Sequence, residues 1–130
     1  MYFLSNIFII SIYLLMFFSS CKKNTNSEIY NHNDYKNFIN SPNIQYDKVW
    51  NTYCITCHKK ETDYIGIDQI EYWEKAAKKN IDTLFNHVYY GFEGKYGVMP
   101  KRGSCYECSK IEIKNSIYHL FYLSDNYSKK

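Results

Sequence analysis

The five residues from Cys54 to His58 restrict the fold of this 130-residue chain more than any other feature. They read Cys-Ile-Thr-Cys-His, and Cys-x-x-Cys-His is the pattern to which a c-type haem is attached. Two thiols three positions apart can add to two vinyl groups of one porphyrin, and the imidazole that follows can bind the iron. The alternative is a Cys-x-x-Cys pair followed by an incidental histidine. The haem interpretation predicts a fold built around a covalently attached ring held by Cys54, Cys57 and His58.

The first 20 residues contain no charged side chain, and an apolar run over residues 7–18 is interrupted only by Ser11. Two serines then precede Cys21. This pattern predicts a bacterial lipoprotein signal, in which Cys21 becomes the acylated first residue of the mature chain. An uncleaved anchoring helix and ordinary signal cleavage are the alternatives. All three place the domain on the periplasmic side of a bacterial membrane, where haem is attached to this motif in bacteria.

Composition bounds the remainder of the chain. Residues 21–43 are polar and Asn-rich, which predicts a flexible lipid-anchored tether, and we expect one small domain over residues 44–130. The net charge of +3 is too small to indicate a nucleic-acid partner. No Ser/His/Asp set, paired carboxylates or phosphate-binding loop is visible, so we expect that the protein is not an enzyme. We also expect a monomer.

Two further cysteines, Cys105 and Cys108, form a local pair. In an oxidising compartment such a pair is expected to be a disulfide, and its short ring would stiffen a loop. The competing interpretation is a zinc site that combines this pair with Cys54 and Cys57.

Helical periodicity predicts an all-α domain, and no segment alternates as a strand would. Three glycines over residues 91–97 predict a loop, and Asn80 suits a left-handed cap at the end of a helix. A capping box at Ser109–Glu112 begins the last helix. The expected helices cover residues 44–57, 68–79, 82–91 and a C-terminal segment that starts at Ser109.

An axial position of the iron opposite His58 needs a ligand. Met99 lies in the Gly-rich loop and precedes Pro100, an extended setting that can bring a thioether to the distal face. His87, His119 and an open position are the alternatives.

Together these pieces resemble a bacterial class I monohaem cytochrome c, closest to the c-five type, over residues 44–123. The resemblance implies about four helices around one covalently bound haem c. It implies that the first and last helices cross at Trp50 and Leu120, and that Trp73 approaches a haem propionate. Cofactor contacts are expected from Cys54, Cys57, His58, Trp73, Met99 and Pro100, with His58 and Met99 on the iron. The pieces are Cys54-Ile-Thr-Cys57-His58, Trp73, Ile81-Asp-Thr-Leu84, Gly91, Met99-Pro100, Gly103 and Cys105-Tyr-Glu-Cys108.

The chain departs from this family at two places. The loop over residues 59–67 lacks the usual Pro, which leaves open which backbone carbonyl accepts a hydrogen bond from His58. Ala76 stands where the family has Arg, so Lys75 or Lys78 is the expected propionate partner.

Histidine and methionine ligation fills both axial positions, and a thioether favours ferrous iron. The resemblance therefore implies an extracytoplasmic protein that carries one electron between respiratory-chain proteins. A basic rim of Lys59, Lys60, Lys101 and Arg102 would steer transient docking. The alternatives are a haem-based sensor or peroxidase-like enzyme with a displaceable distal ligand, and a zinc-stabilised structural module.

Overall fold

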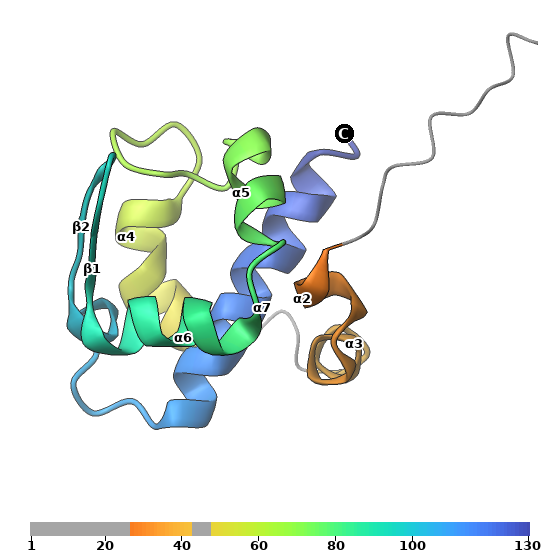
Figure 1. Cartoon of the computed structure of the whole chain (residues 1–130), viewed down its shortest axis with the longest axis horizontal. Coiled ribbons are helices and arrows are strands. Elements are labelled where there is room, and N and C mark those ends of the chain that lie inside the picture. Colours follow the sequence, from red (N-terminus) through yellow and green to blue (C-terminus); the bar gives the residue numbers. More distant parts are fainter. Residues whose placement is uncertain (1–26, 43–47) are drawn as a thin grey trace, which may run out of the picture.

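The computed structural model describes residues 27–42 and 48–130, and most of these are helical. The expectation of a predominantly helical domain is confirmed, with one antiparallel hairpin added (Figure 1). A π-helical turn, Trp50–Cys54, leads directly into α4, and a 3-10 turn, Lys101–Ser104, follows the hairpin. The elements are α2 (Glu28–Asn31), α3 (Asn33–Ile39), α4 (Ile55–His58), α5 (Ile70–Ala76), α6 (Ile81–Tyr90), β1 (Phe92–Gly94), β2 (Gly97–Met99) and α7 (Lys110–Tyr127).

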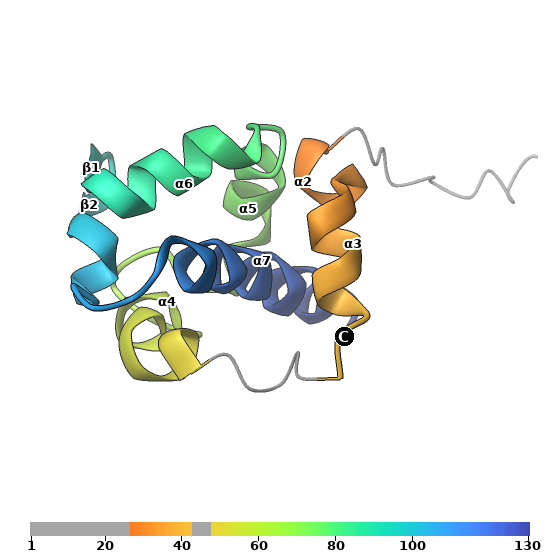
Figure 2. The same ribbon diagram turned by 90° about the horizontal axis from the view of Figure 1, so that it is seen from below.

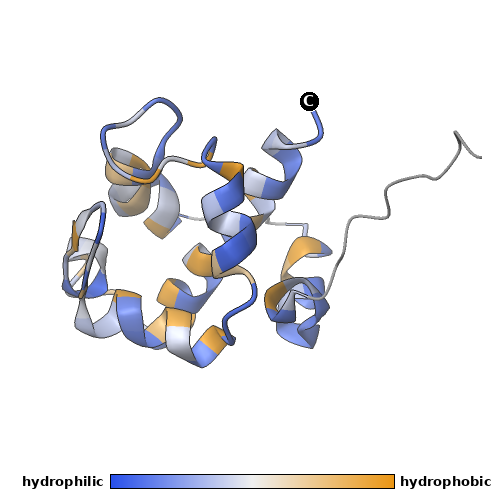
Figure 3. Ribbon diagram, turned by 45° about the horizontal axis from the view of Figure 1, so that its top comes forward, coloured by the Kyte–Doolittle hydropathy of each residue, from blue (hydrophilic) through white to orange (hydrophobic). Residues whose placement is uncertain are grey.

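Helix α7 is the centre of the domain. The expected capping box is present, because the Ser109 hydroxyl accepts from the Glu112 N–H and the Glu112 carboxylate accepts from the Ser109 N–H at 2.8 Å. Ile113, Ile117 and Leu120 lie on one apolar face of α7 and are buried. Figure 2 shows α7 running between α4 on one side and α5 and α6 on the other. Figure 3 shows that hydrophobic and hydrophilic residues both occur along the helices, as expected of amphipathic helices.

Helices α2 and α3 also pack against α7. Ile29 and Tyr35 are buried there. The Tyr35 ring packs edge-on against Tyr118 of α7 at 5.8 Å between centroids, and Tyr30 packs against Phe121 at 6.1 Å. Aromatic contacts of this kind hold the two short helices on the domain.

The prediction of a flexible tether over residues 21–43 is therefore wrong for residues 27–42, which belong to the folded domain. Few aliphatic residues are needed because tyrosines and a phenylalanine supply the buried area. The polar residues act locally: the Ser27 hydroxyl accepts from the Tyr30 N–H, and His32 Nδ1 accepts from the Asp34 N–H. Both side chains cap the helices that follow them.

Residues 92–99 form a hairpin, so the prediction of a loop over residues 91–97 is wrong. Glu93 pairs with Val98 and Phe92 with Met99 across an antiparallel register. The strands are only three residues long, which is too short for alternation to be recognised. Gly97 has a φ of +115°, a conformation that glycine adopts without strain and that helps the chain reverse direction.

Helix boundaries also differ from the expected ones. The second helix begins at Ile70 and ends at Ala76, two to three residues inside the predicted range. Asn80 has a φ of −69°, so it is not a left-handed cap; its side chain accepts from the Thr83 N–H at 2.7 Å and begins α6. Residues 43–47 at the start of the predicted first helix lie outside the described residues.

The predicted signal over residues 1–20 and the lipid site Cys21 also lie outside the described residues. Within residues 27–42 and 48–130, none of the helices combines the length and apolarity that crossing a membrane requires.

Candidate functional site

The Cys-x-x-Cys-His motif lies at the junction of the π-helical turn and α4. Cys54 ends the turn, and Cys57 and His58 belong to α4. The wide turn is closed by a hydrogen bond from the Ile55 N–H to the Trp50 carbonyl. Both cysteine side chains are half-buried. The local geometry therefore turns the motif toward the interior of the domain.

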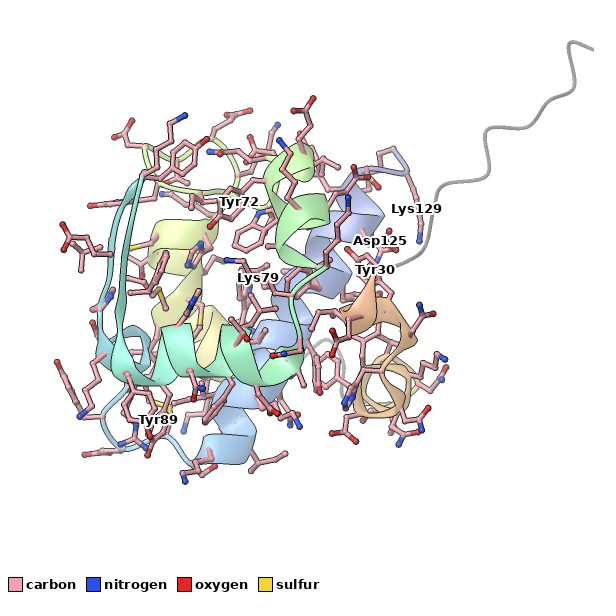
Figure 4. All side chains as sticks on the ribbon, in the orientation of Figure 1. Tyr30, Tyr72, Lys79, Tyr89, Asp125 and Lys129 are labelled. Carbon is pink, nitrogen blue, oxygen red and sulfur yellow. A yellow bond between two sulfur atoms is a disulfide. The ribbon has the colours of Figure 1, made fainter. Side chains whose placement is uncertain are left out.

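Two adjoining cavities lie beside this motif. The larger has a volume of about 310 Å³ and includes Cys57 and Trp73 in its wall; the smaller, of about 40 Å³, includes Cys54 and Trp50. Figure 4 shows side chains filling the space between α5, α6 and the hairpin, with Tyr72 and Lys79 among them. The residues shared by both walls are His58, Val88, Met99, Ile117 and Leu120.

His58 is held in one tautomer. Its Nδ1 lies 2.8 Å from the Ile65 carbonyl oxygen. Because a carbonyl only accepts, Nδ1 carries the proton, and Nε2 keeps the lone pair that a metal ion can bind. Burial lowers the pKa of the His58 imidazole, partly offset by this hydrogen bond. A neutral, oriented imidazole is the form that ligates iron.

The loop after the motif holds the Ile65 carbonyl in place, which answers the question that the missing Pro left open. The Ile67 N–H donates to the His58 carbonyl at 3.0 Å, and the Gln69 side-chain amide donates to the Tyr64 carbonyl at 2.7 Å. Gly66 is tightly enclosed, because a Cβ there would lie 2.4 Å from the Lys59 carbonyl oxygen. The loop is thus fixed by hydrogen bonds and close packing rather than by a Pro.

Trp73 is buried beside His58, with 5.7 Å between ring centroids. Its indole N–H donates to the Gly66 carbonyl at 2.7 Å. The single N–H donor that would reach a propionate is therefore used within the protein. This bond supports the loop that holds His58, and the approach of Trp73 to a haem propionate stays a prediction.

Met99 ends β2 and is half-buried, and it lies in the walls of both cavities. The following turn is close to its side chain: a Cβ on Gly103 would lie 3.4 Å from the Met99 methyl carbon. Pro100 lies in the wall of the larger cavity only. The hairpin thus brings a thioether to the same space as His58, across 41 positions of chain that no local pattern connects.

Arg102 braces the segment after Met99. Its guanidinium donates to the Tyr106 and Cys108 carbonyls and lies 4.8 Å from the centre of the Tyr89 ring. Cys105 and Cys108 are joined in a disulfide within the same loop. Since Arg102 binds inward, it does not belong to the predicted exposed basic rim.

The alternative histidines are placed differently. His119 is buried against Trp50, at 5.6 Å between ring centroids, and lies in neither cavity wall. His87 lies in the wall of the larger cavity, but its ring is stacked on Phe92 at 4.1 Å. The pKa of His87 is lowered by burial and by the charge of Lys79.

Several residues in the wall of the larger cavity were not anticipated from the sequence. Lys79 precedes α6, and Lys95 and Tyr96 form the turn of the hairpin. No periodic pattern marks them, because each comes from a short connection.

Of the predicted basic rim, Lys60 is paired with Glu61 at 2.7 Å.

The four-cysteine zinc site loses two of its ligands to the disulfide between Cys105 and Cys108. Among residues 27–42 and 48–130, no three Cys, His, Asp or Glu side chains are grouped to share a metal ion. The geometry does fit a haem, since an oriented imidazole and a thioether border both of the adjoining, largely apolar cavities, and each cavity has one of the two thiols in its wall. No protein-family model matches the chain. No curated protein matches it either.

Proposed function

We propose that this chain is an extracytoplasmic electron-transfer protein with the class I cytochrome c fold, carrying one haem c on Cys54 and Cys57. In this proposal His58 and Met99 would be the side chains that bind its iron. The observation that supports it best is that His58, oriented by Ile65, shares both cavity walls with Met99. The two residues are far apart in sequence, so only the fold brings them to one space.

In this proposal the protein's side chains have two roles: they orient the iron-binding imidazole, and they exclude water from the haem. Ile65 holds the proton on His58 Nδ1 and so directs the Nε2 lone pair to the metal position. Val88, Ile117 and Leu120 line the space with apolar surface. A haem bound there would supply reversible one-electron exchange. A closely packed site should change its shape little when the charge on the haem changes. Such a site suits electron transfer to partners in the respiratory chain.

The first test is spectroscopic. The full chain is produced in a bacterium that attaches c-type haem, and oxidised and reduced spectra are recorded. We expect a covalently bound haem, the weak far-red band of thioether-to-iron coordination in the oxidised form, and a six-coordinate reduced spectrum. Met99→Leu, which keeps an apolar side chain of similar volume, should lose the far-red band and bind carbon monoxide when reduced. His87→Leu is the matched control and should retain the band.

Three results would contradict the proposal, in whole or in part. A wild-type protein without covalent haem contradicts it entirely. Covalent haem that lacks the far-red band and binds carbon monoxide favours instead the sensor or peroxidase-like enzyme. A wild-type protein that lacks the far-red band and does not bind carbon monoxide, but binds it after His87→Leu, would transfer the ligand role to His87.

A further inference from the structure

The larger cavity has an apolar interior and a cationic mouth. The inner wall is formed by side chains such as Leu84, Ile117 and Phe121. Among the described residues, Lys79 and Lys95 are the only charged side chains in the wall, and both are exposed. Among the described residues that line it, none is Asp or Glu. This arrangement is complementary to a ligand with an apolar body and carboxylates at one edge.

Lys79 lies across the mouth of the cavity. Its backbone N–H donates to the Ala76 carbonyl at 2.9 Å, directly before Asn80 caps α6. Its ammonium lies 5.9 Å from the centre of the Phe92 ring, so the side chain extends from the α5–α6 connection toward β1. The lowered pKa of His87, to which the Lys79 charge contributes, agrees with this position.

Lys95 approaches the same mouth from the hairpin turn, with its ammonium 5.3 Å from the centre of the Tyr96 ring. Tyr96 in turn packs edge-on against Tyr72 of α5 at 5.6 Å. Two ammonium groups and two phenol rings from three elements therefore border one opening. By contrast, Lys75 and Lys78 do not lie in this wall.

We propose that Lys79 and Lys95 are the counter-ions of the haem carboxylates in this chain. Trp73 does not fill this role because its indole N–H donates to Gly66, and Ala76 offers no charge. The assignment rests on the proposed haem function and differs from the sequence-based expectation of Lys75 or Lys78. Lysine ammonium groups pair with carboxylates and favour their ionised form.

The test uses the haem-loaded full chain and the resonance Raman band of propionate bending, with reduction potential as a second measurement. Lys79→Gln should shift the propionate band, and the double variant Lys79→Gln/Lys95→Gln should shift it further. Lys79→Arg, which keeps the charge, should restore most of the wild-type band. Lys78→Gln, adjacent and exposed but outside the wall, is the control and should leave it unchanged.

The reduction potential should fall in Lys79→Gln, because loss of a nearby positive charge favours the ferric state. We expect the equilibrium constant for reduction to drop by about two- to tenfold at low salt, and less at high salt. A propionate band in Lys79→Gln identical to that in Lys78→Gln, with covalent haem present, overturns the counter-ion assignment and leaves the electron-transfer proposal intact. Absence of covalent haem from the wild-type chain overturns both.

Discussion

The indole N–H of Trp73 donates to the carbonyl of Gly66, one residue after the carbonyl that accepts from His58. The two hydrogen bonds, at 2.7 and 2.8 Å, fix consecutive peptide groups of one loop. Trp73 thereby positions the loop whose Ile65 carbonyl orients His58.

Trp73→Phe removes this N–H and leaves the Gly66 carbonyl with the Gln69 N–H, at 3.1 Å, in place of two donors. We expect the free energy of unfolding to fall by about 1–3 kcal/mol, measured by urea denaturation. Tyr72→Phe is the control, since its ring packs against Trp73 at 5.0 Å and the substitution keeps that ring. Equal effects of the two substitutions would contradict the importance of the Gly66 hydrogen bond.

Arg102→Lys tests the brace after Met99. A lysine cannot donate to the Tyr106 and Cys108 carbonyls together in the geometry of a guanidinium, so we expect a loss of about 1–3 kcal/mol in the free energy of unfolding. Lys101→Gln changes the neighbouring exposed cation and should cost much less. The melting temperatures of the two variants are compared by thermal unfolding. Similar melting temperatures would contradict the stabilising role of the Arg102 hydrogen bonds.

Ile29→Ala tests whether α2 belongs to the domain. Ile29 is 0% exposed, so its truncation should reduce the free energy of unfolding by about 2–5 kcal/mol. Asn37→Ala, on an exposed position of α3, should have little effect. If Ile29→Ala unfolds at the same urea concentration as wild type, residues 27–42 act as a tether after all.

The ion pair between Asp34 of α3 and Lys114 of α7, at 2.9 Å, predicts a pH dependence. The hydrogen bond from Lys114, together with its charge, lowers the pKa of Asp34. A carboxyl with a lowered pKa in the folded state stabilises that state above its unfolded pKa of about 4, and this contribution disappears as the pH falls further.

Asp34→Asn should therefore lower stability slightly at pH 7, and the difference from wild type should vanish near pH 2. Urea denaturation at both pH values measures this. Because Asp34 is fully exposed, high salt should also reduce the difference. A difference that persists unchanged at acid pH would show that the ion pair is not its source.

Local patterns predicted the features that depend on a few adjacent residues. The capping box at Ser109–Glu112 is confirmed, because a cap is satisfied by side chains within one turn. The tether over residues 21–43 failed for the opposite reason. Whether Tyr35 is buried depends on Tyr118 of α7, more than 70 residues away, and composition alone does not contain that information.

The candidate site divides in the same way. The sequence alone gives the identity and spacing of Cys54, Cys57 and His58. It also shows that Met99 is a thioether far from them along the chain. Which carbonyl orients His58, which carbonyl accepts from Trp73 and which lysines border the cavity were decided only by tertiary structure. Spacing within one helical turn is set by covalent geometry, whereas a loop carbonyl or a cavity mouth exists only after distant segments have packed together.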